Sequence, residues 1–376
     1  MRKTAILTVI LLTIGFAMSS DCFAIGGIDK VVTDIYVDAE NGSNDNEGLS
    51  EEDALRTITY AMLIYGDLDN PKRTINIHVA PGYYDKKHGE KIPLKIERNI
   101  HLYGAGPEET ILCGWSYNPM LNNGAVLVFE NADNAGIDGF TIQGGGRGIM
   151  CINSSPRINN CVIKDLLYHL GILIAIFDGN SAISCENSSP LITNCVITNC
   201  EGGNYLYFYP LDIVNSSPVV INCLIVEKNN NDDTRIFIEG DSHPTFVNVT
   251  MACNTGFYMK DETAMFVAFG SSVRIVNSIF WDNGPSSISG RGIVSVFYSN
   301  ITGEWDGIGN IEVNPLFVKG PLGNFYLSHG ETHGYYSQCV DAGSPAMTFG
   351  LDKLTTRTDG VFDSGRVDMG YHYPIE

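Results

Sequence analysis

Three carboxylates stand within short runs of β-forming residues, and the segments around these runs carry basic and aromatic side chains. The carboxylates are Glu186, Asp212 and Glu239. The other candidate side chains are Lys164, Lys228, Arg235, His169, Tyr205, Tyr207 and Tyr209. Carboxylate oxygens bind calcium, and a pair of carboxylates can act as acid and base or as acid and nucleophile. A lysine or arginine whose pKa is lowered near a metal ion can accept a proton.

A repeated phrase indicates which elements position these side chains. Residues 151–163 read CINSSPRINNCVI, residues 185–197 read CENSSPLITNCVI, and residues 213–225 read IVNSSPVVINCLI. Aligned on its proline, Pro156 in the first copy, the repeat continues through Pro244 and Val273, at separations of 34, 28, 26 and 29 residues. An asparagine stands four residues after each aligned position: Asn160, Asn194, Asn222, Asn248 and Asn277.

Each unit contains very short β-forming runs that are separated by turn residues. Short strands that return once per unit and stack on themselves predict a parallel β-solenoid, with coils about 4.8 Å apart. We expect the asparagines to be buried at a turn, bonded to the backbone of their own coil and to the amide of the coil beneath. We expect the neighbouring cysteine column to behave as small hydrophobic residues, as a ladder of partly free thiols.

Each unit contains, in order, a glycine-led strand, an Asn-Ser-Ser-Pro turn, a second strand, an asparagine turn and a third strand. This order resembles the right-handed parallel β-helix of the pectate-lyase-like superfamily. The resemblance covers roughly residues 76–325 and implies an all-β fold with an asparagine ladder in the second turn. The first strands are then GIMCI, AISCE, LDIV and RIFIE, and the long variable connections follow the third strands.

In such a β-helix, the groove beside the first strands, walled by the loops after the third strands, is the usual ligand site. Side chains along a strand point alternately into and out of the solenoid. If the inward side chains are those of Cys151, Cys185, Ile213 and Ile238, the outward side chains form two columns across the stacked strands. The first column contains Met150, Ser184, Asp212 and Phe237. The second contains Ile152, Glu186, Val214 and Glu239. The three carboxylates would then line one face, below loops that carry the basic residues and the tyrosines.

The resemblance implies two kinds of carbohydrate chemistry. In a polysaccharide lyase, the three carboxylates would hold calcium and Lys164, Lys228 or Arg235 would abstract the proton. In a glycoside hydrolase, two of the carboxylates would act as acid and base or nucleophile. The residues that would contact the sugar in either case are Tyr205, Tyr207, Tyr209 and His169. The alternative is that the carboxylates are solvated surface and that the tyrosines and the histidine pack on the solenoid.

The two ends of the solenoid need caps, because open sheet edges would pair with other chains. Residues 25–75 predict a strand, a polar loop and a capping helix that begins near Ser50 and places Leu55, Ile58, Ala61 and Met62 on one apolar stripe. This part resembles the N-terminal segment of secreted bacterial β-helix proteins, and residues 326–376 resemble the closing segment of the choice-of-anchor type. Asp359, Asp363 and Asp368 lack the spacing of a calcium loop, so we expect them to staple the last coil through arginine and backbone bonds.

The first residues and the net charge indicate an extracytoplasmic protein. Residues 1–24 have a basic start, a short apolar stretch and small residues at the end, which predicts a cleaved signal peptide and a periplasmic or extracellular location; an uncleaved membrane anchor is the alternative. Cleavage removes two basic residues and one acidic residue, which changes the net charge from −20 to −21. Such a charge argues against nucleic acid and anionic membranes as partners.

Two functions follow from the sequence. The first is a secreted carbohydrate-active protein, a lyase or a hydrolase, with calcium as the candidate cofactor. The second is a non-catalytic surface protein that binds glycans or other cell-surface components through the same face. An enzyme needs its acid and its base within hydrogen-bond reach of one substrate pose, whereas a binding protein needs only aromatic and scattered polar groups.

Overall fold

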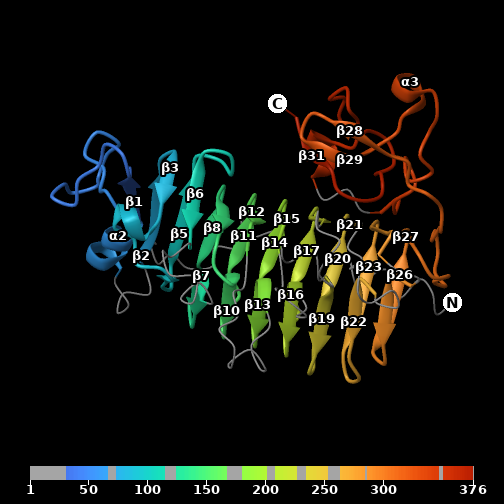
Figure 1. Cartoon of the computed structure of the whole chain (residues 1–376), viewed down its shortest axis with the longest axis horizontal. Coiled ribbons are helices and arrows are strands. Elements are labelled where there is room, and N and C mark those ends of the chain that lie inside the picture. The colour runs from blue at the N-terminus through green and yellow to red at the C-terminus, as the bar shows by residue number, and fades with distance from the viewer. Residues whose placement is uncertain are drawn as a thin grey trace.

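The chain winds into three parallel sheets that stack coil upon coil (Figure 1). The computed structural model describes residues 31–66, 73–114, 124–166, 180–200, 208–226, 234–252, 263–283, 286–346 and 350–375. Each complete coil takes one strand from each sheet, in the order sheet C, sheet A, sheet B. The long connections follow the sheet B strands, as predicted for third strands.

The strands of the three sheets are short, and their bounds repeat along the chain. Sheet C has eight strands: β4 (Leu94–Ile96), β7 (Ala125–Glu130), β10 (Arg147–Ile152), β13 (Asn180–Glu186), β16 (Phe208–Val214), β19 (Ile236–Glu239), β22 (Met265–Val267) and β25 (Ile288–Gly290). Sheet A has ten: β1 (Val31–Val37), β2 (Arg73–Val79), β5 (Ile100–Gly104), β8 (Gly136–Asp138), β11 (Arg157–Asn159), β14 (Leu191–Thr193), β17 (Val219–Ile221), β20 (Thr245–Val247), β23 (Ser272–Val276) and β26 (Ile293–Phe297). Sheet B has nine: β3 (Gly82–Tyr84), β6 (Thr110–Cys113), β9 (Thr141–Gln143), β12 (Val162–Lys164), β15 (Val196–Thr198), β18 (Leu224–Val226), β21 (Thr250–Ala252), β24 (Ile279–Trp281) and β27 (Asn300–Ile301).

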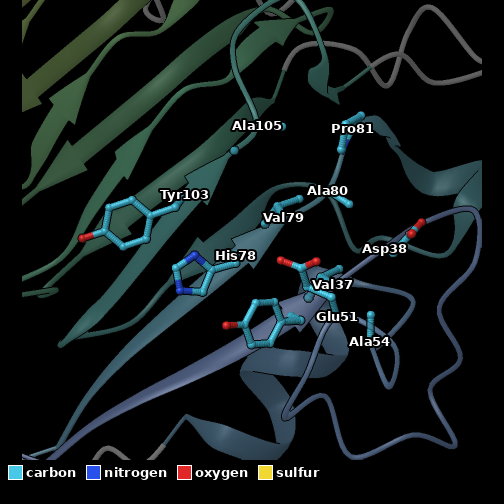
Figure 2. Close-up of a pocket in the computed structure, with 12 residues that line it drawn as sticks. Val37, Asp38, Glu51, Ala54, His78, Val79, Ala80, Pro81, Tyr103 and Ala105 are labelled. Atoms are coloured by element: carbon cyan, nitrogen blue, oxygen red, sulfur yellow. The ribbon is translucent and has the colours of Figure 1, made fainter.

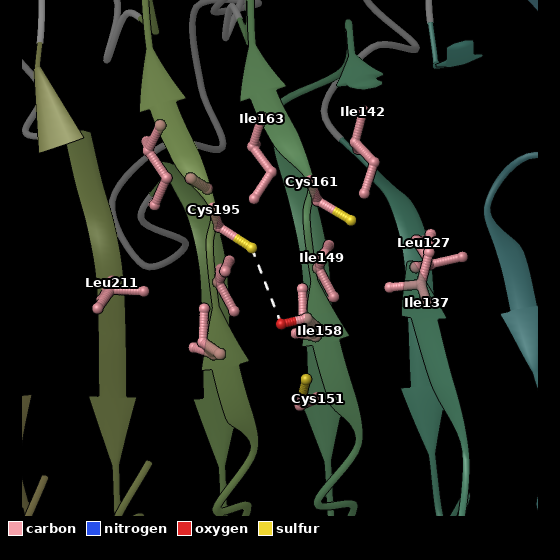
Figure 3. Close-up of a cluster of buried hydrophobic side chains, with 14 of the residues drawn as sticks. Leu127, Ile137, Ile142, Ile149, Cys151, Ile158, Cys161, Ile163, Cys195 and Leu211 are labelled. Carbon is pink, nitrogen blue, oxygen red and sulfur yellow. Dashed lines mark hydrogen bonds between the residues drawn. The ribbon is translucent and has the colours of Figure 1, made fainter. Parts of the chain in front are cut away.

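Buried aliphatic side chains and thiols fill the interior of the solenoid (Figure 3). The eight cysteines in the described part of the chain are all buried, as expected for a column of small hydrophobic residues. Cys195 donates to the carbonyl oxygen of Ile158 in the coil beneath, at 3.8 Å. Burial, with a smaller contribution from Cys223, holds the pKa of the Cys195 thiol well above its usual value, and the hydrogen bonds of Cys161 oppose this shift. These thiols are therefore structural.

The Asn-Ser-Ser-Pro phrase forms the turn from sheet C to sheet A, and its first serines make a buried ladder. The backbone N–H of Ser154 donates to Ser188 Oγ at 2.9 Å, and the N–H of Ser188 donates to Ser216 Oγ at 2.8 Å. Ser216 continues the ladder by donating its N–H to Ser242 Oγ at 3.0 Å. Each serine thus satisfies a buried amide that the turn leaves without a strand partner.

The asparagine turn from sheet A to sheet B differs in part from the prediction. The five repeat asparagines adopt left-handed backbone conformations, with φ between 48° and 55°, which asparagine tolerates better than most residues. Asn160 and Asn194 are exposed, and Asn222, Asn248 and Asn277 are buried. The expectation of burial is wrong for the first two, although Asn194 Nδ2 still bonds to Asn159 Oδ1 of the coil beneath at 3.0 Å. The last three are buried because the C-terminal segment covers them.

That C-terminal segment lies along the side of the solenoid (Figure 1). It contains β28 (Phe317–Gly320), β29 (Gly323–Leu327), α3 (Gly330–His333), the 3-10 turn η3 (Leu351–Lys353), β30 (Leu354–Thr355) and β31 (Tyr373–Pro374). Asn222 Nδ2 donates to the carbonyl oxygen of His372 at 3.0 Å, and Asn248 Nδ2 donates to that of Asp368 at 2.9 Å. The expected arginine and backbone staples are present within the segment: Asp359 pairs with Arg357 at 2.6 Å, and Asp363 accepts from the N–H of Asp368 at 3.0 Å.

The segment reaches the last coil from the side of sheet B, where Asn300 Nδ2 donates to Cys339 Sγ at 3.2 Å. The turn that follows β27 also packs on the last coil. The N–H of Tyr298 donates to the carbonyl oxygen of Ile308 at 2.8 Å, Asn300 and Ile311 form an isolated bridge, and Trp305 packs against the main core. The apolar outer side of sheet B explains the actual position, because Leu224 and Val226 pack there against residues of the C-terminal segment.

At the other end, the capping helix is shorter than predicted and begins later. Helix α2 spans Ile58–Tyr65, and its N-cap is Thr57, whose side chain accepts from the N–H of Tyr60. Ser50 caps only a local turn, by accepting from the N–H of Asp53 at 3.3 Å. The acidic group at the helix start is Glu90, which follows the 3-10 turn η1 (Lys86–His88). It accepts from the first two helical N–H groups at 2.7 and 2.9 Å.

The helix still covers the first coil. Its predicted stripe is partly right: Ile58 and Ala61 are fully buried and Met62 is partly buried against the core, whereas Leu55 pairs with Val37 in an isolated bridge before the helix begins. In the part of the chain that the structure describes, no helix combines the length and the apolar character that crossing a membrane requires.

Candidate functional site

The outer face of sheet C carries the predicted carboxylates in the predicted columns. Parallel pairing places Met150 beside Ser184, Ser184 beside Asp212, and Asp212 beside Phe237. The second column runs through Ile152, Glu186, Val214 and Glu239. Asp212 is therefore a diagonal neighbour of both Glu186 and Glu239. We call the outward side chains of β10, β13, β16, β19 and β22 the sheet-C face.

Asp212 is the most perturbed carboxylate of this face. Burial raises the pKa of Asp212 to about 6, while the Arg147 cation opposes the shift and the Glu239 and Glu186 charges add to it. Burial disfavours the charged form of a carboxyl group, and nearby carboxylates do the same. A carboxyl group with this pKa holds a proton in mildly acidic solution and can lose it near neutrality, which is what a general acid or base requires.

Aromatic rings continue the face beyond Asp212. The ring centres of Tyr209 and Phe237 lie 5.4 Å apart, and the rings of Phe237 and Phe266 stack at 5.4 Å with an interplanar angle of 8°. The Arg235 guanidinium lies 5.9 Å from the Phe237 ring centre and 5.7 Å from that of Phe266. Arg235 thus lies against two rings in a cation–π arrangement.

Lys164 does not join the carboxylates. It is the last residue of β12 in sheet B, where it pairs with Gln143 on one side and Thr198 on the other. The interpretation that a loop carries Lys164 over the sheet-C face is wrong, because the residue belongs to the third strand of its coil. It is also absent from the charges that shift the pKa of Asp212.

Four predicted residues lie outside the described residues: Lys228, His169, Tyr205 and Tyr207. Among the residues that the structure describes, no three His, Cys, Asp or Glu side chains are arranged to hold a metal ion. Glu186, Asp212 and Glu239 therefore do not form the predicted calcium cluster by themselves. The register gives the reason, because Val214 separates the two glutamates in their column and Asp212 stands in the other column.

Two open pockets lie elsewhere, on the outer side of sheet A at the N-terminal end of the solenoid. Their volumes are about 370 and 340 Å³, and Tyr103 lines both. The first is lined by Tyr36, Asp38, Glu51, His78 and neighbouring backbone (Figure 2). The second is lined by His101, Asp138, Arg157 and Asn159. We call this surface the sheet-A trough. Sequence reasoning missed it, although aligning the runs DIYV, NIHV and HLYG would have placed Tyr36, His78 and Tyr103 in one column.

Comparisons with known proteins agree with this architecture. A family model described as right handed beta helix region matches residues 124–304. No curated protein matches the chain. Similar solved structures include a pectin methylesterase from carrot, with 14% identity, a TM-score of 0.37 and coverage of 78% of this chain and 91% of that one.

A pectin methylesterase from Erwinia chrysanthemi has 11% identity, a TM-score of 0.38 and coverage of 73% and 90%. A GH136 lacto-N-biosidase from Eubacterium ramulus has 9% identity, a TM-score of 0.34 and coverage of 71% and 58%. The family match and the three stacked parallel sheets together identify the fold as a right-handed parallel β-helix.

Proposed function

We propose that this protein cleaves glycosidic bonds of a polysaccharide that lies along the sheet-C face, with Asp212 as the proton donor. The observation that carries the proposal is the position of Asp212, half-buried between two further carboxylates and beside an aromatic surface. Glycoside hydrolysis needs one carboxyl group that keeps its proton and a second that stays ionised. Burial supplies the first condition at Asp212, whose pKa is raised to about 6.

The second carboxylate in the proposal is Glu239. It stands on the adjacent strand and two residues along, so a strand spacing of about 4.8 Å and a two-residue rise of about 6.6 Å separate the two backbones by about 8 Å. Side chains on one face of a sheet stand roughly perpendicular to it, so the two carboxyl groups keep roughly this spacing. Inverting glycosidases hold their carboxyl groups about 6.5–9.5 Å apart, which leaves room for a water molecule. Asp212 gives its proton to the glycosidic oxygen as the bond to the anomeric carbon breaks. Glu239 takes a proton from the water whose oxygen bonds to that carbon.

The aromatic side chains provide a surface for neighbouring sugar units. Tyr209 and Phe237 are partly exposed and continue from Asp212 toward Phe266. Sugar rings pack their C–H faces on such rings, and the fixed stack loses little conformational freedom on binding. The predicted signal peptide at residues 1–24 fits this proposal, since polysaccharides of this kind lie outside the cell.

The test is hydrolysis by the mature protein of a panel of neutral and uronate polysaccharides, with calcium or with a chelator. We expect new reducing ends, with inverted configuration in the first product seen by proton NMR. Asp212→Asn should lower the rate about 100-fold or more, and wild-type activity should fall above about pH 6 as the donor loses its proton. Glu130→Gln, an exposed carboxylate on β7 of the same sheet, is the matched control and should keep its activity.

Unsaturated products that need calcium would contradict hydrolysis and favour a lyase. A second candidate function is glycan binding without cleavage. One observation favours it: two open pockets of the described surface lie on sheet A, away from Asp212. If no polysaccharide of the panel is cleaved but a polysaccharide gel retards the protein, the result would support this second function against the first.

A further inference from the structure

The outer side of sheet A changes character along the solenoid. At the N-terminal end one outward column reads Tyr36, His78 and Tyr103, and farther along the same column continues with Asp138 and Asn159. The alternate residues Ile35, Ile77 and Leu102 point inward and are fully buried. The three rings therefore do not contribute to the main core. They form an aromatic surface that faces solvent.

We propose that the sheet-A trough is a glycan-binding site, separate from the sheet-C face, in which neutral sugar units stack on the rings of Tyr36, His78 and Tyr103. The site takes a neutral hexopyranose chain rather than a uronate chain. It requires no catalysis, so it stands independently of the hydrolytic function proposed for Asp212.

The three rings are held in place before any ligand arrives. The ring centres of Tyr36 and His78 lie 5.1 Å apart with an interplanar angle of 23°, and those of His78 and Tyr103 lie 5.7 Å apart at 22°. His78 Nε2 lies 2.9 Å from Asp34 Oδ1, and the same carboxylate accepts from Asn76 Nδ2 at 3.0 Å. Rings that are fixed in this way lose little rotamer freedom on binding, which favours association.

The rings are also accessible. Tyr103 is 38% exposed, and the side chain of His78 is 40% exposed. Figure 2 shows the rings of His78 and Tyr103 side by side, with their faces turned the same way, along one side of the pocket. Small-molecule sites combine an apolar floor with a few polar groups that fix orientation. Here the two pockets, of about 370 and 340 Å³, share Tyr103 in their linings, and each is large enough for a sugar unit.

Polar groups around the rings match the hydroxyl groups of a neutral sugar. Glu51 lines the first pocket, and its carboxylate makes no hydrogen bond to the part of the chain that the structure describes. Figure 2 shows this carboxylate on the same side of the pocket as the ring of His78. In the second pocket, Asp138 accepts from Asn159 Nδ2 at 2.7 Å, and Arg157 stands nearby. Carboxylates accept hydrogen bonds from hydroxyl groups at two oxygens.

The charges decide between neutral and acidic glycans. The carboxylates in and beside the trough are Asp34, Asp38, Glu51 and Asp138, and the permanent cation among its lining residues is Arg157. Burial, together with the Arg157 charge, lowers the pKa of His101, so this imidazole is neutral at physiological pH. A uronate chain would meet an excess of like charge, whereas a neutral chain would not.

The experiment is affinity electrophoresis of the mature protein in gels that contain hydroxyethylcellulose, xyloglucan, galactomannan or soluble starch, with polygalacturonate as the anionic comparison. We expect retardation in at least one neutral gel and none in polygalacturonate. Tyr103→Ala should weaken binding about tenfold, and His78→Ala should weaken it by a similar factor. Tyr103→Phe should bind as the wild type does, because it keeps the stacking face.

Tyr83→Ala is the matched control, since Tyr83 is 51% exposed on the neighbouring strand β3 and does not line either pocket. Asp212→Asn should be retarded as strongly as the wild type, which separates this site from the catalytic proposal. Two results would overturn the inference: no retardation in any neutral gel, or retardation that persists unchanged in folded Tyr103→Ala and His78→Ala. A circular dichroism spectrum of each variant establishes that it is folded.

Discussion

At the scale of the residue, the carboxyl group of Asp212 connects function to stability. Burial raises its pKa to about 6 from an unfolded value of 3.8, so the folded protein binds this proton more tightly than the unfolded chain does. A group whose folded pKa is raised contributes stability at low pH, and the contribution is lost as the pH rises through the folded pKa. The relevant window runs from about pH 4 to about pH 6.

Asp212→Asn should therefore stabilise the protein at neutral pH but not in acid. The amide is nearly isosteric and carries no charge to bury, so the gain in free energy of unfolding should reach about 3 kcal/mol at most above pH 6. Near pH 4 both proteins carry a neutral side chain and the gain should vanish. Urea denaturation at about pH 4 and about pH 8 measures the difference. A gain that is the same at both pH values, or that Glu130→Gln reproduces, would contradict this account of the site.

Sequence alone predicted which carboxylates share a face but not which of them is perturbed. Alternation along a strand is a local property, so the columns of Glu186, Asp212 and Glu239 followed from the repeat. The burial of Asp212 depends on neighbours from several coils, among them Arg147, and no spacing in the sequence encodes it. Lys164 was misplaced for a related reason, because the end of its strand lies at the boundary between strand and loop.

At the scale of the element, the turns hold the coils together. In the first turn, Ser188 Oγ accepts from the N–H of Ser154 at 2.9 Å and donates to the carbonyl oxygen of Glu186 at 2.8 Å. The N–H of Ser154 and the hydroxyl group of Ser188 are both buried. The next residue, Ser189, accepts from the N–H of Ser217 at 2.9 Å but is exposed. Adjacent serines thus make similar bonds in different surroundings.

Ser188→Ala should lower the free energy of unfolding by about 1–3 kcal/mol, because it leaves a buried N–H without a partner. Ser189→Ala should change it by about 0.5 kcal/mol or less, since water replaces the lost hydroxyl. Urea denaturation of the two variants, followed by far-ultraviolet circular dichroism, compares them directly. Equal losses in both variants would mean that the buried ladder contributes nothing beyond its exposed counterpart.

The repeat predicted the strands, the inward thiols and the turn positions, because each coil repeats the same local solution. It did not predict how helix α2 begins. The acidic group that meets the helix N-terminus is Glu90, which lies 32 residues after Ile58 in the chain. A contact between a helix and a later loop is made by the tertiary fold, whereas Ser50 was chosen on the local signal for an N-cap.

At the scale of the whole molecule, the C-terminal segment acts as a side cover. The segment was predicted to cap the last coil, which it contacts through the bond from Asn300 to Cys339. It also returns over sheet B, where Tyr326, Tyr371 and Tyr373 pack with Leu224 and Val226. It leaves the sheet-C face and the sheet-A trough uncovered by its described residues. Both candidate surfaces therefore remain accessible to a long polymer.

The asparagine turns allow this cover to be tested. Asn160 and Asn248 occupy equivalent positions with φ of 48° and 52°, so alanine introduces the same backbone strain at both. Only Asn248 contacts the C-terminal segment, by donating from Nδ2 to the carbonyl oxygens of Asp368 at 2.9 Å and Gly370 at 3.3 Å. The difference between the two substitutions therefore reports the docking contribution together with the bond that Asn248 Oδ1 accepts from Asn277 Nδ2 at 3.3 Å.

Asn248→Ala should cost about 1–3 kcal/mol more than Asn160→Ala, because it leaves buried carbonyl groups without donors. It should also speed proteolytic cleavage within residues 340–372, since weaker docking raises the population of the open segment. Limited proteolysis with mass spectrometry of the fragments locates the cleavage, and urea denaturation gives the energies. If both variants lose the same stability and the segment is cut no faster, the side cover does not depend on the asparagine turns, and the aromatic contact with sheet B must hold it alone.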